Sequence, residues 1–305
     1  MISFSIHDQK FLSCVMNASG ILCTTKEQLN KLFQIQDLVV SKSATLSKQD
    51  GNFSPRLFLF EHGSLNSIGL ENPGYEYYLD YQSPYETKTL ILSIYPDSPA
   101  TLYKMLEMIE RKKRKHVIEI NLSCPNVNKN ENKNMEAYLK IVSKFNQTIC
   151  GIKLPPFFYP QDIFEVSQLL LQYKQFLKFV TCCNTIPNGL YVNIQTETTE
   201  IYPKNGVGGI GGSLNKGIVL FNVREFYQQL KNQIPIIACG GIQNGNDAFD
   251  AILCGAVAVQ VGTPLLKQGL SILPKIETEL KQIMIQKNYK QIEDFRGQLK
   301  IISKL

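Results

Sequence analysis

The chain has 305 residues, of which 44% are hydrophobic and 19% are charged, and its formal net charge is +6. This composition is ordinary for a globular protein, and the length suits one large α/β barrel or two smaller domains. We expect neither a transmembrane helix nor a secretory signal, since no run of 18 apolar residues occurs and residues 1–11 lack a basic region followed by an apolar core.

Strand-like and helix-like segments alternate along the chain. The apolar runs that predict buried strands are 14–17, 38–41, 89–94, 117–120, 149–153, 179–183, 235–239 and 256–261. Amphipathic stretches of helical length lie at 26–36, 100–114, 136–145, 161–173, 223–230, 247–253 and 265–287. This alternation predicts a single (β/α)₈ barrel domain over residues 1–305, with a flavodoxin-like open sheet as the alternative.

Two long insertions depart from a minimal barrel. Residues 43–85 follow the second predicted strand, and residues 188–212 follow the sixth. Because both lie after the carboxyl ends of strands, we expect them to roof the active site.

Cysteine usage and charge limit the classes of protein to which this chain can belong. The cysteines form no C-x-x-C pair, which is typical of a reduced cytoplasmic protein without disulfides or a zinc site. The basic run at 111–115 would suit nucleic acid, but it also ends a predicted helix, where cations favour the helix dipole and solvent. We favour the second interpretation and expect neither a nucleic-acid nor a membrane partner.

The stretch 116–126, H-V-I-E-I-N-L-S-C-P-N, is central to the prediction of function. Pro125 lacks an N–H group, so the strand must end near Cys124 and place this thiol on a loop at the strand's carboxyl end. A lone cysteine is more often a small buried hydrophobic residue. Here Asn121 and Asn126 flank it with amides that can read the edge of a flat polar ligand.

Polar or small residues follow seven of the eight predicted strands. They are Asn17 to Gly20, Lys42, Asn121, Lys153, Asn184 with Thr185, Gly240 with Gly241, and Gly262 with Thr263. A lysine at the end of a buried strand is costly unless it meets an anion or a polar ligand. In barrel enzymes these positions form the active site.

The glycine endings indicate a phosphate, which barrels often bind after their last two strands. A phosphate site, amides and a central lysine together suit flavin mononucleotide (FMN), because Lys153 could stabilise negative charge at the ring's N1–C2 edge. A sugar-phosphate enzyme is the competing interpretation, but it predicts more carboxylates and histidines at strand ends. G-x-G-x-x-G at 206–211 is weak as a dinucleotide motif, since no strand–helix–strand unit with the required acid follows.

The sequence resembles the soluble class 1A dihydroorotate dehydrogenases over nearly its whole length. The motifs that carry the resemblance are M-N-A-S-G (16–20), S-K-S-A-T-L (41–46), G-N-F-S-P-R (51–56), L-N-S-I-G-L (65–70), Y-Y-L-D-Y (77–81), N-L-S-C-P-N (121–126), G-I-K-L-P-P (151–156), G-V-G-G-I-G-G (206–212), A-C-G-G-I (238–242) and V-G-T (261–263).

The resemblance implies non-covalent FMN, oxidation of dihydroorotate to orotate, fumarate as the oxidant, and a cytosolic homodimer. It implies FMN contacts from Ala18, Gly20, Lys42, Ser43, Asn121, Lys153, Gly212, Gly240, Gly241, Gly262 and Thr263. It implies substrate contacts from Lys42, Asn66, Ile68, Gly69, Leu70, Asn121, Asn126, Asn184 and Thr185. Cys124 would be the catalytic base, its pKa lowered by nearby Lys42 or by backbone donors.

The sequence also departs from the family's motifs in places, and two rival functions stay open. The segment 128–132 differs from the family's active-site lid, Pro187 replaces a family glycine, and Cys239 replaces a family threonine. The membrane-bound class of the family uses a serine base and an N-terminal extension, neither of which is expected here. A tRNA dihydrouridine synthase is the closest enzymatic rival, and a non-catalytic flavin-binding barrel is the rival from another class.

Overall fold

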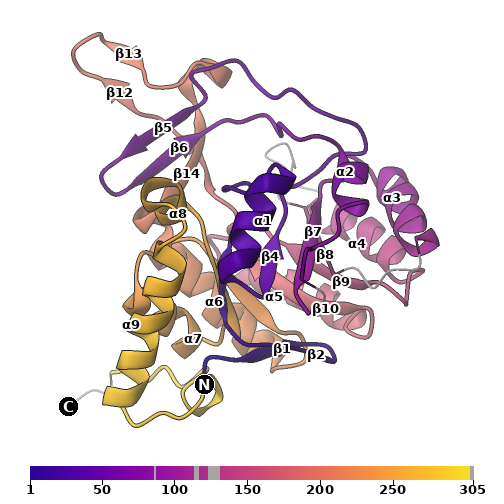
Figure 1. Ribbon diagram of the computed structural model, residues 1–305, viewed down its shortest axis with the longest axis vertical. Helices are drawn as coiled ribbons and strands as arrows, with labels where there is room; N and C mark the ends of the chain where they lie inside the picture. Colours follow the sequence, from indigo (N-terminus) through magenta and orange to yellow (C-terminus); the bar gives the residue numbers. More distant parts are fainter. Residues whose placement is uncertain (86, 113–116, 123–130, 303–305) are drawn as a thin grey trace.

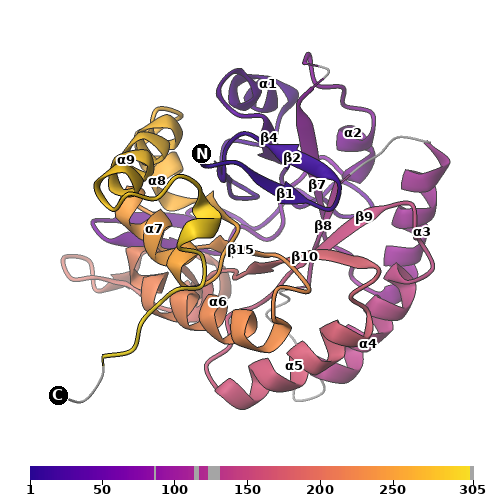
Figure 2. The same cartoon turned by 90° about the horizontal axis from the view of Figure 1, so that it is seen from below.

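The computed structural model describes residues 1–85, 87–112, 117–122 and 131–302, with only the backbone of 131–134. An eight-stranded sheet with the order β3-β16-β15-β10-β9-β8-β7-β4 forms its centre, and every strand pair in it is parallel. These strands are β3 (Val15–Asn17), β4 (Leu38–Val40), β7 (Thr89–Ile94), β8 (Val117–Asn121), β9 (Ile149–Lys153), β10 (Leu177–Cys182), β15 (Ile236–Cys239) and β16 (Ala258–Val261). The sheet curls into a nearly closed barrel surrounded by helices (Figures 1 and 2), which confirms the predicted (β/α)₈ fold.

The seam of the barrel lies between β3 and β4, the two ends of the strand order. The Asn17 amide bridges it, because its Nδ2 donates to the Val40 carbonyl at 2.8 Å and its Oδ1 accepts from the Val40 N–H at 2.9 Å. A side chain thus replaces one rung of the backbone ladder and holds two strand ends together.

The helices cover the outside of the barrel. They are α1 (Lys26–Ile35), α2 (Tyr75–Leu79), α3 (Pro99–Arg111), α4 (Glu131–Val142), α5 (Pro160–Gln172), α6 (Lys216–Leu230), α7 (Gly245–Leu253), α8 (Thr263–Gln268) and α9 (Ile272–Gln286). Side-chain caps fix the starts of α1, α3 and α7, since Thr25, Ser98 and Asn244 each accept a hydrogen bond from a backbone N–H of the first turn.

Two of the predicted helices have different bounds in the structure. The single helix expected over 265–287 is two helices, because Gly269 at φ +73° ends α8 in a conformation that favours glycine. Helix α6 begins at Lys216 and not at Val223, and its first two turns are anchored by the buried side chains of Val219 and Asn222.

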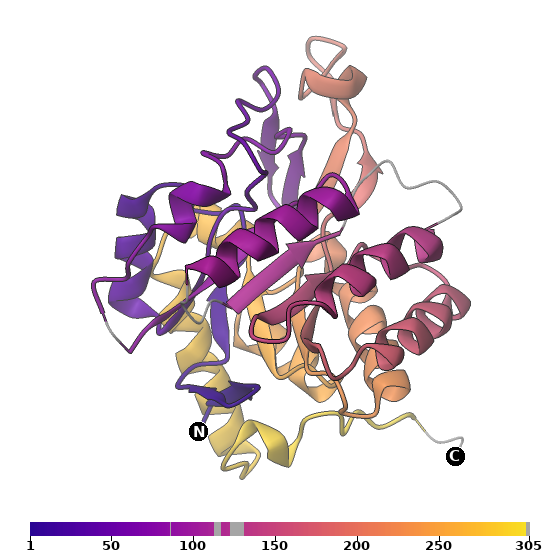
Figure 3. The same cartoon turned by 90° about the vertical axis from the view of Figure 1, so that its right-hand side faces the viewer.

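Both insertions contribute to a second, antiparallel sheet with the order β11-β14-β6-β5. Its strands are β5 (Leu57–Phe60), β6 (Gly63–Asn66), β11 (Ile186–Gly189) and β14 (Gly208–Gly212). The hairpin of β12 (Val192–Asn193) and β13 (Thr198–Thr199) projects from it, while β1 (Phe4–Ile6) and β2 (Gln9–Phe11) form a hairpin at the opposite end of the barrel (Figures 1 and 3). The second sheet lies at the end where the barrel strands finish, as expected for a roof. Short 3₁₀ turns occupy Pro203–Gly206, Ser213–Asn215 and Ile292–Asp294.

Candidate active site

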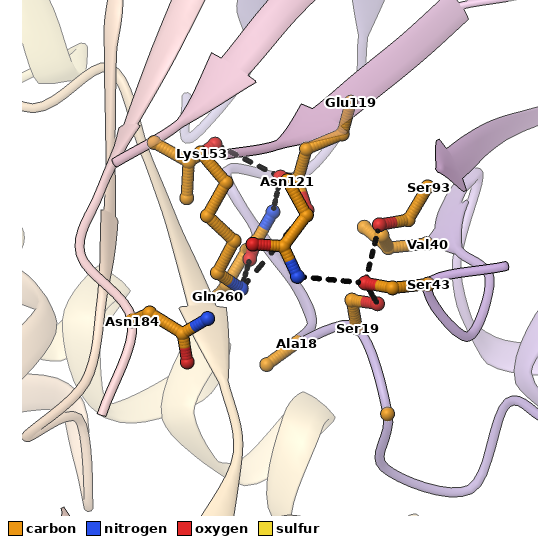
Figure 4. Close-up of polar contacts among 12 residues, drawn as sticks. Ala18, Ser19, Val40, Ser43, Ser93, Glu119, Asn121, Lys153, Asn184 and Gln260 are labelled. Carbon is orange, nitrogen blue, oxygen red and sulfur yellow. Dashed lines mark hydrogen bonds and ion pairs between the residues drawn. The ribbon is translucent and has the colours of Figure 1, made fainter. Parts of the chain in front are cut away.

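A buried cation stands at the end of β9. Lys153 is only 4% exposed, and its ammonium donates a hydrogen bond to Gln260 Oε1 on β16 at 3.1 Å. The carboxylate of Glu119, on the neighbouring strand β8, lies 4.0 Å from the same nitrogen. Figure 4 shows these side chains pointing toward one another inside the barrel. Lys153 therefore brings positive charge to the strand-end region that the sequence singled out.

A chain of hydroxyl groups lies beside this lysine. Asn121, paired in register with Lys153, donates from Nδ2 to Ser43 Oγ at 3.1 Å. The Ser43 hydroxyl also shares hydrogen bonds with Ser93 at 2.8 Å and with Ser19 at 3.0 Å (Figure 4). Residues at the carboxyl ends of β3, β4, β7 and β8 are thus held in one network, which fixes the polar atoms before any ligand binds.

A second lysine follows β4. The backbone N–H of Lys42 donates to the Cys23 carbonyl at 3.0 Å, and a Cβ placed on Gly20 would lie 3.3 Å from the Lys42 ammonium. Burial lowers the pKa of Lys42, against the raising effects of Cys23 and Glu71. Gly20 at φ +94° thus leaves room for this side chain, and Ala18 packs nearby with its N–H bonded to the Val261 carbonyl at 2.9 Å.

Glycines line the ends of β14, β15 and β16. Gly241 has φ +76°, and a Cβ on it would lie 2.5 Å from the Cα of Lys216, so no side chain fits there. Gly240 and Gly212 also have positive φ, at +112° and +94°. After β16, Gly262 precedes Thr263, whose hydroxyl lies 3.1 Å from that of Ser64 on β6. Exposed backbone and hydroxyl groups of this kind can cradle a phosphate.

Two of the predicted substrate amides, those of Asn66 and Asn184, lie at the end of the barrel that the second sheet covers. Asn66, at the end of β6, donates to the Gly209 carbonyl at 3.0 Å, and a side chain on Gly209 would collide with Thr185. The N–H of Asn184, just after β10, donates to the Leu154 carbonyl at 3.0 Å, and the Asn184 Oδ1 accepts from the Thr185 N–H at 2.8 Å. The structure therefore brings Asn66 and Thr185 to opposite sides of β14.

The segment 68–70 (Ile68, Gly69 and Leu70) is held by contacts with a neighbouring loop. The Ile68 carbonyl accepts from the N–H of Asn52 at 2.9 Å, and a Cβ on Gly69 would meet Asn52. The backbone of this turn therefore contacts the 49–52 segment. Glu71, the next residue in the chain, carries a charge that raises the pKa of Lys42.

Cys124 and Asn126 lie outside the described residues, as does most of the lid segment 128–132. Their expected roles stay predictions. The described part of β8 ends three residues before Cys124 in the chain, at Asn121.

Sequence reasoning missed a second set of buried polar residues inside the barrel. Glu119 is 0% exposed, and its Oε2 accepts hydrogen bonds from Gln260 Nε2 at 2.7 Å and from Thr181 Oγ1 at 2.9 Å. The sequence contains a signal for this set, namely polar residues inside apolar strands. They are a glutamate in V-I-E-I-N and a glutamine in A-V-Q-V. An ionisable residue in a buried strand is a candidate for function.

Comparison with known proteins agrees with this geometry. A family model described as dihydroorotate dehydrogenase matches residues 1–284. A Streptococcus pneumoniae protein named probable dihydroorotate dehydrogenase A (fumarate) is 42% identical over 308 residues, covering 96% of each chain. The dihydroorotate dehydrogenase (fumarate) of Lachancea kluyveri is 43% identical over 93% of each chain. The dihydroorotate dehydrogenase A (fumarate) of Lactococcus lactis is 41% identical over 98% of this chain and 99% of its own.

Solved structures support the fold. The Eimeria tenella dihydroorotate dehydrogenase in complex with ferulenol superposes with a TM-score of 0.79 at 19% identity, over 97% of this chain and 88% of that one.

In the part of the chain that the structure describes, we find no helix that is long and apolar enough to cross a membrane. From the family match and the near full-length relatives, this chain belongs to the dihydroorotate dehydrogenase family.

Proposed function

We propose that the protein binds FMN at the carboxyl end of the barrel and oxidises dihydroorotate to orotate in pyrimidine biosynthesis, with fumarate as the electron acceptor. The observation that carries the proposal is the Lys153 ammonium at the end of β9. Lys153 is paired in register with Asn121, and its ammonium is hydrogen-bonded to Gln260 of β16, the strand that Gly262 follows. The fumarate-linked names of relatives that match almost the whole chain support the choice of oxidant.

The residues present fit FMN. Positive φ at Gly240 and Gly241 exposes backbone where a phosphate would lie, and a Cβ on Gly241 would collide with Lys216, so the close approach of backbone there requires glycine. Lys153 and Lys42 supply positive charge for a ring whose N1–C2 edge becomes negative on reduction. Asn121 and Ser43 offer amide and hydroxyl groups to the ring edge.

We assign roles from this fit and from the family motifs. The FMN set is Ala18, Gly20, Lys42, Ser43, Asn121, Lys153, Gly212, Gly240, Gly241, Gly262 and Thr263. The substrate set is Lys42, Asn66, Ile68, Gly69, Leu70, Asn121, Asn126, Asn184 and Thr185. Amides in the second set can pair with the imide and carboxylate of dihydroorotate without adding a competing negative charge.

The reaction requires removal of a proton from C5 of dihydroorotate and of a hydride from C6. FMN, when bound, supplies the hydride acceptor at N5. Cys124 is the proposed base for the C5 proton, because it lies three residues after β8 in the chain and a thiolate can take a proton near neutral pH once its pKa is lowered. Lys42 would favour that thiolate and pair with the substrate carboxylate.

We further propose that residues 1–305 form one domain and that the protein acts in the cytoplasm as a homodimer. Support for the dimer comes from apolar side chains that are exposed on the second sheet and its hairpin. They are Leu57, Leu59, Leu190, Val192, Ile194 and Tyr202. A surface of this kind is typical of a protein–protein interface.

An anaerobic absorbance experiment tests the proposed function. The purified protein should be yellow, should bleach when dihydroorotate is added, and should regain its colour with fumarate but not with NAD⁺ or a quinone. A colourless protein that takes up no added FMN would overturn the proposal at its base. Bleaching without recovery in fumarate would exclude only the oxidant, and activity on dihydrouridine in tRNA would favour the rival enzyme.

A further inference from the structure

We propose that Glu119 is a positioning residue: its buried carboxylate, acting with the amide of Gln260, keeps Lys153 charged and aimed at the carboxyl end of the barrel. The inference rests on the proposed function, in which FMN meets Lys153. Glu119 and Gln260 lie outside the family motifs, whereas Lys153 lies within one of them.

Gln260 is a bridge between the two charges. Its Oε1 accepts from the Lys153 ammonium at 3.1 Å, and its Nε2 donates to the Glu119 carboxylate at 2.7 Å. Each end of the amide thus meets the charge that suits it, which fixes its orientation. Figure 4 shows the glutamine between the two side chains, on a strand on the far side of the barrel from β8.

Glu119 also acts on Lys153 directly. Its Oε1 lies 4.0 Å from the lysine Nζ and has no hydrogen-bond partner among the described residues, while its Oε2 is occupied by Gln260 and Thr181. A carboxylate that is 0% exposed requires a compensating cation. The geometry makes Lys153 that cation.

Other groups around Lys153 do not replace this anion. Burial raises the pKa of the Cys183 and Cys239 thiols, and it raises that of Cys23 to about 11, so all three are neutral near pH 7. Lys42 is a second cation that faces the site and repels Lys153. Burial opposes the charge of Lys153, whereas Cys239 and Glu119 act in the other direction and raise its pKa. Because the thiols carry no charge near pH 7, Glu119 is the anion that lies beside the ammonium.

The Glu119→Gln variant tests the inference because it removes the charge and keeps the size. Without the carboxylate, a buried lysine should lose its proton well below its usual pKa. The affinity of the full chain for FMN, measured by titration against the flavin-free protein, should approach that of wild type at the low-pH end, where the lysine is still charged. As the pH rises from about 6.5 to 9 it should fall to at least about tenfold below wild type, the scale of one lost charge-assisted contact. Glu119→Asp, which keeps the charge, should follow the wild-type pH profile.

A second readout needs no flavin. A lysine whose pKa is lower in the folded than in the unfolded state binds fewer protons when folded, so the stability of Glu119→Gln should approach that of wild type as pH rises. Urea unfolding of the flavin-free chains should show this convergence. Thr181→Val is the matched control: it removes the other hydrogen bond to Glu119 Oε2, so its difference from wild type should not change with pH.

The two readouts separate the inference from the proposed function. If wild type binds no FMN, the proposed function fails, while the unfolding series still tests the Glu119–Lys153 pair. A pH-independent difference between Glu119→Gln and wild type in both measurements would overturn the inference. If Glu119→Gln does not fold, adding Lys153→Met should restore folding; failure of this double variant would show that the carboxylate serves the core and not the lysine.

Discussion

Asn121 on β8 donates a hydrogen bond of 3.1 Å to Ser43, which follows β4, although β7 separates these two strands in the barrel. Ser93 on β7 shares a hydrogen bond of 2.8 Å with the same hydroxyl. One serine therefore joins the ends of three strands at the centre of the candidate active site.

We expect Ser43→Ala to lower the free energy of unfolding by about 1–3 kcal/mol, because buried partners lose their hydrogen bond. It should also weaken FMN binding, since the Asn121 amide would be less firmly held. Urea unfolding measures the first effect and flavin titration the second. Ser143→Ala, which removes an exposed hydroxyl bonded to Lys140, is the control and should change stability by less than about 0.5 kcal/mol. Equal effects for the two variants would contradict the role of Ser43.

Gly241→Ala should destabilise the protein and abolish or strongly weaken FMN binding. Its φ is +76°, and the added Cβ would lie 2.5 Å from the Cα of Lys216, so backbone must move at the proposed phosphate site. Gly217→Ala is a matched control on the adjacent helix α6, where an added Cβ meets no atom within 4 Å. That change should raise stability by about 0.5–1 kcal/mol through helix propensity. Thermal unfolding and flavin content distinguish the pair, and a flavin-replete Gly241→Ala protein would refute the placement of the phosphate.

Cys124→Ser should slow flavin reduction by dihydroorotate about 10²-fold or more at neutral pH, the usual effect of losing a general base. An alcohol holds its proton far above the range in which a thiol titrates, so the serine cannot take the C5 proton near pH 7. The substitution keeps the shape of the site, so FMN and orotate binding should remain nearly intact. Stopped-flow reduction across a pH series measures the effect, and the deficit should shrink as pH rises.

The controls for Cys124→Ser are other cysteine variants. Cys182→Ser, Cys183→Ala and Cys254→Ala should not show the same pH-dependent deficit in the reduction rate. Reduction of Cys124→Ser at the wild-type rate near pH 7 would show that another group takes the proton.

The dimer proposal predicts that Ile194→Asp with Val192→Asp yields a monomer. Ile194 is 88% exposed at the tip of the β12–β13 hairpin, and a charge placed in an apolar interface is left without solvent or a partner. Light scattering should give twice the chain mass of 34.5 kDa for wild type and the chain mass itself for the variant. Leu12→Asp changes another exposed side chain, 76% exposed near the β1–β2 hairpin, and should leave the mass unchanged. A monomeric wild-type protein would disprove the proposal.

Local signals in the sequence were sufficient for the barrel and for much of the candidate site. Each barrel strand is a short apolar run, and a buried parallel strand needs no more than that pattern to be recognised. The lysine at the end of β9 and the glycines after β15 stand out because charge and positive φ are unusual at such places. Positions next to strand ends could therefore be assigned before their neighbours were known.

Tertiary structure decided what these residues contact. Strand β6 pairs with β14 although about 140 residues separate them, and no local pattern in either insertion specifies that partner. The split of the last helical stretch at Gly269 also depended on the backbone, since apolar periodicity continues across it.

The clearest case in which the sequence does not specify contacts is the buried cluster of Glu119, Lys153 and Gln260. In the sequence they are isolated polar residues in three strands, and nothing local says whether they face the barrel interior or which of them meet. Closure of the barrel brings β16 and β8 to face each other across its interior, so the glutamine lies between the carboxylate and the ammonium. Pairing of buried charges is a property of the closed fold, because the low-polarity interior that makes it necessary does not exist until the strands have assembled.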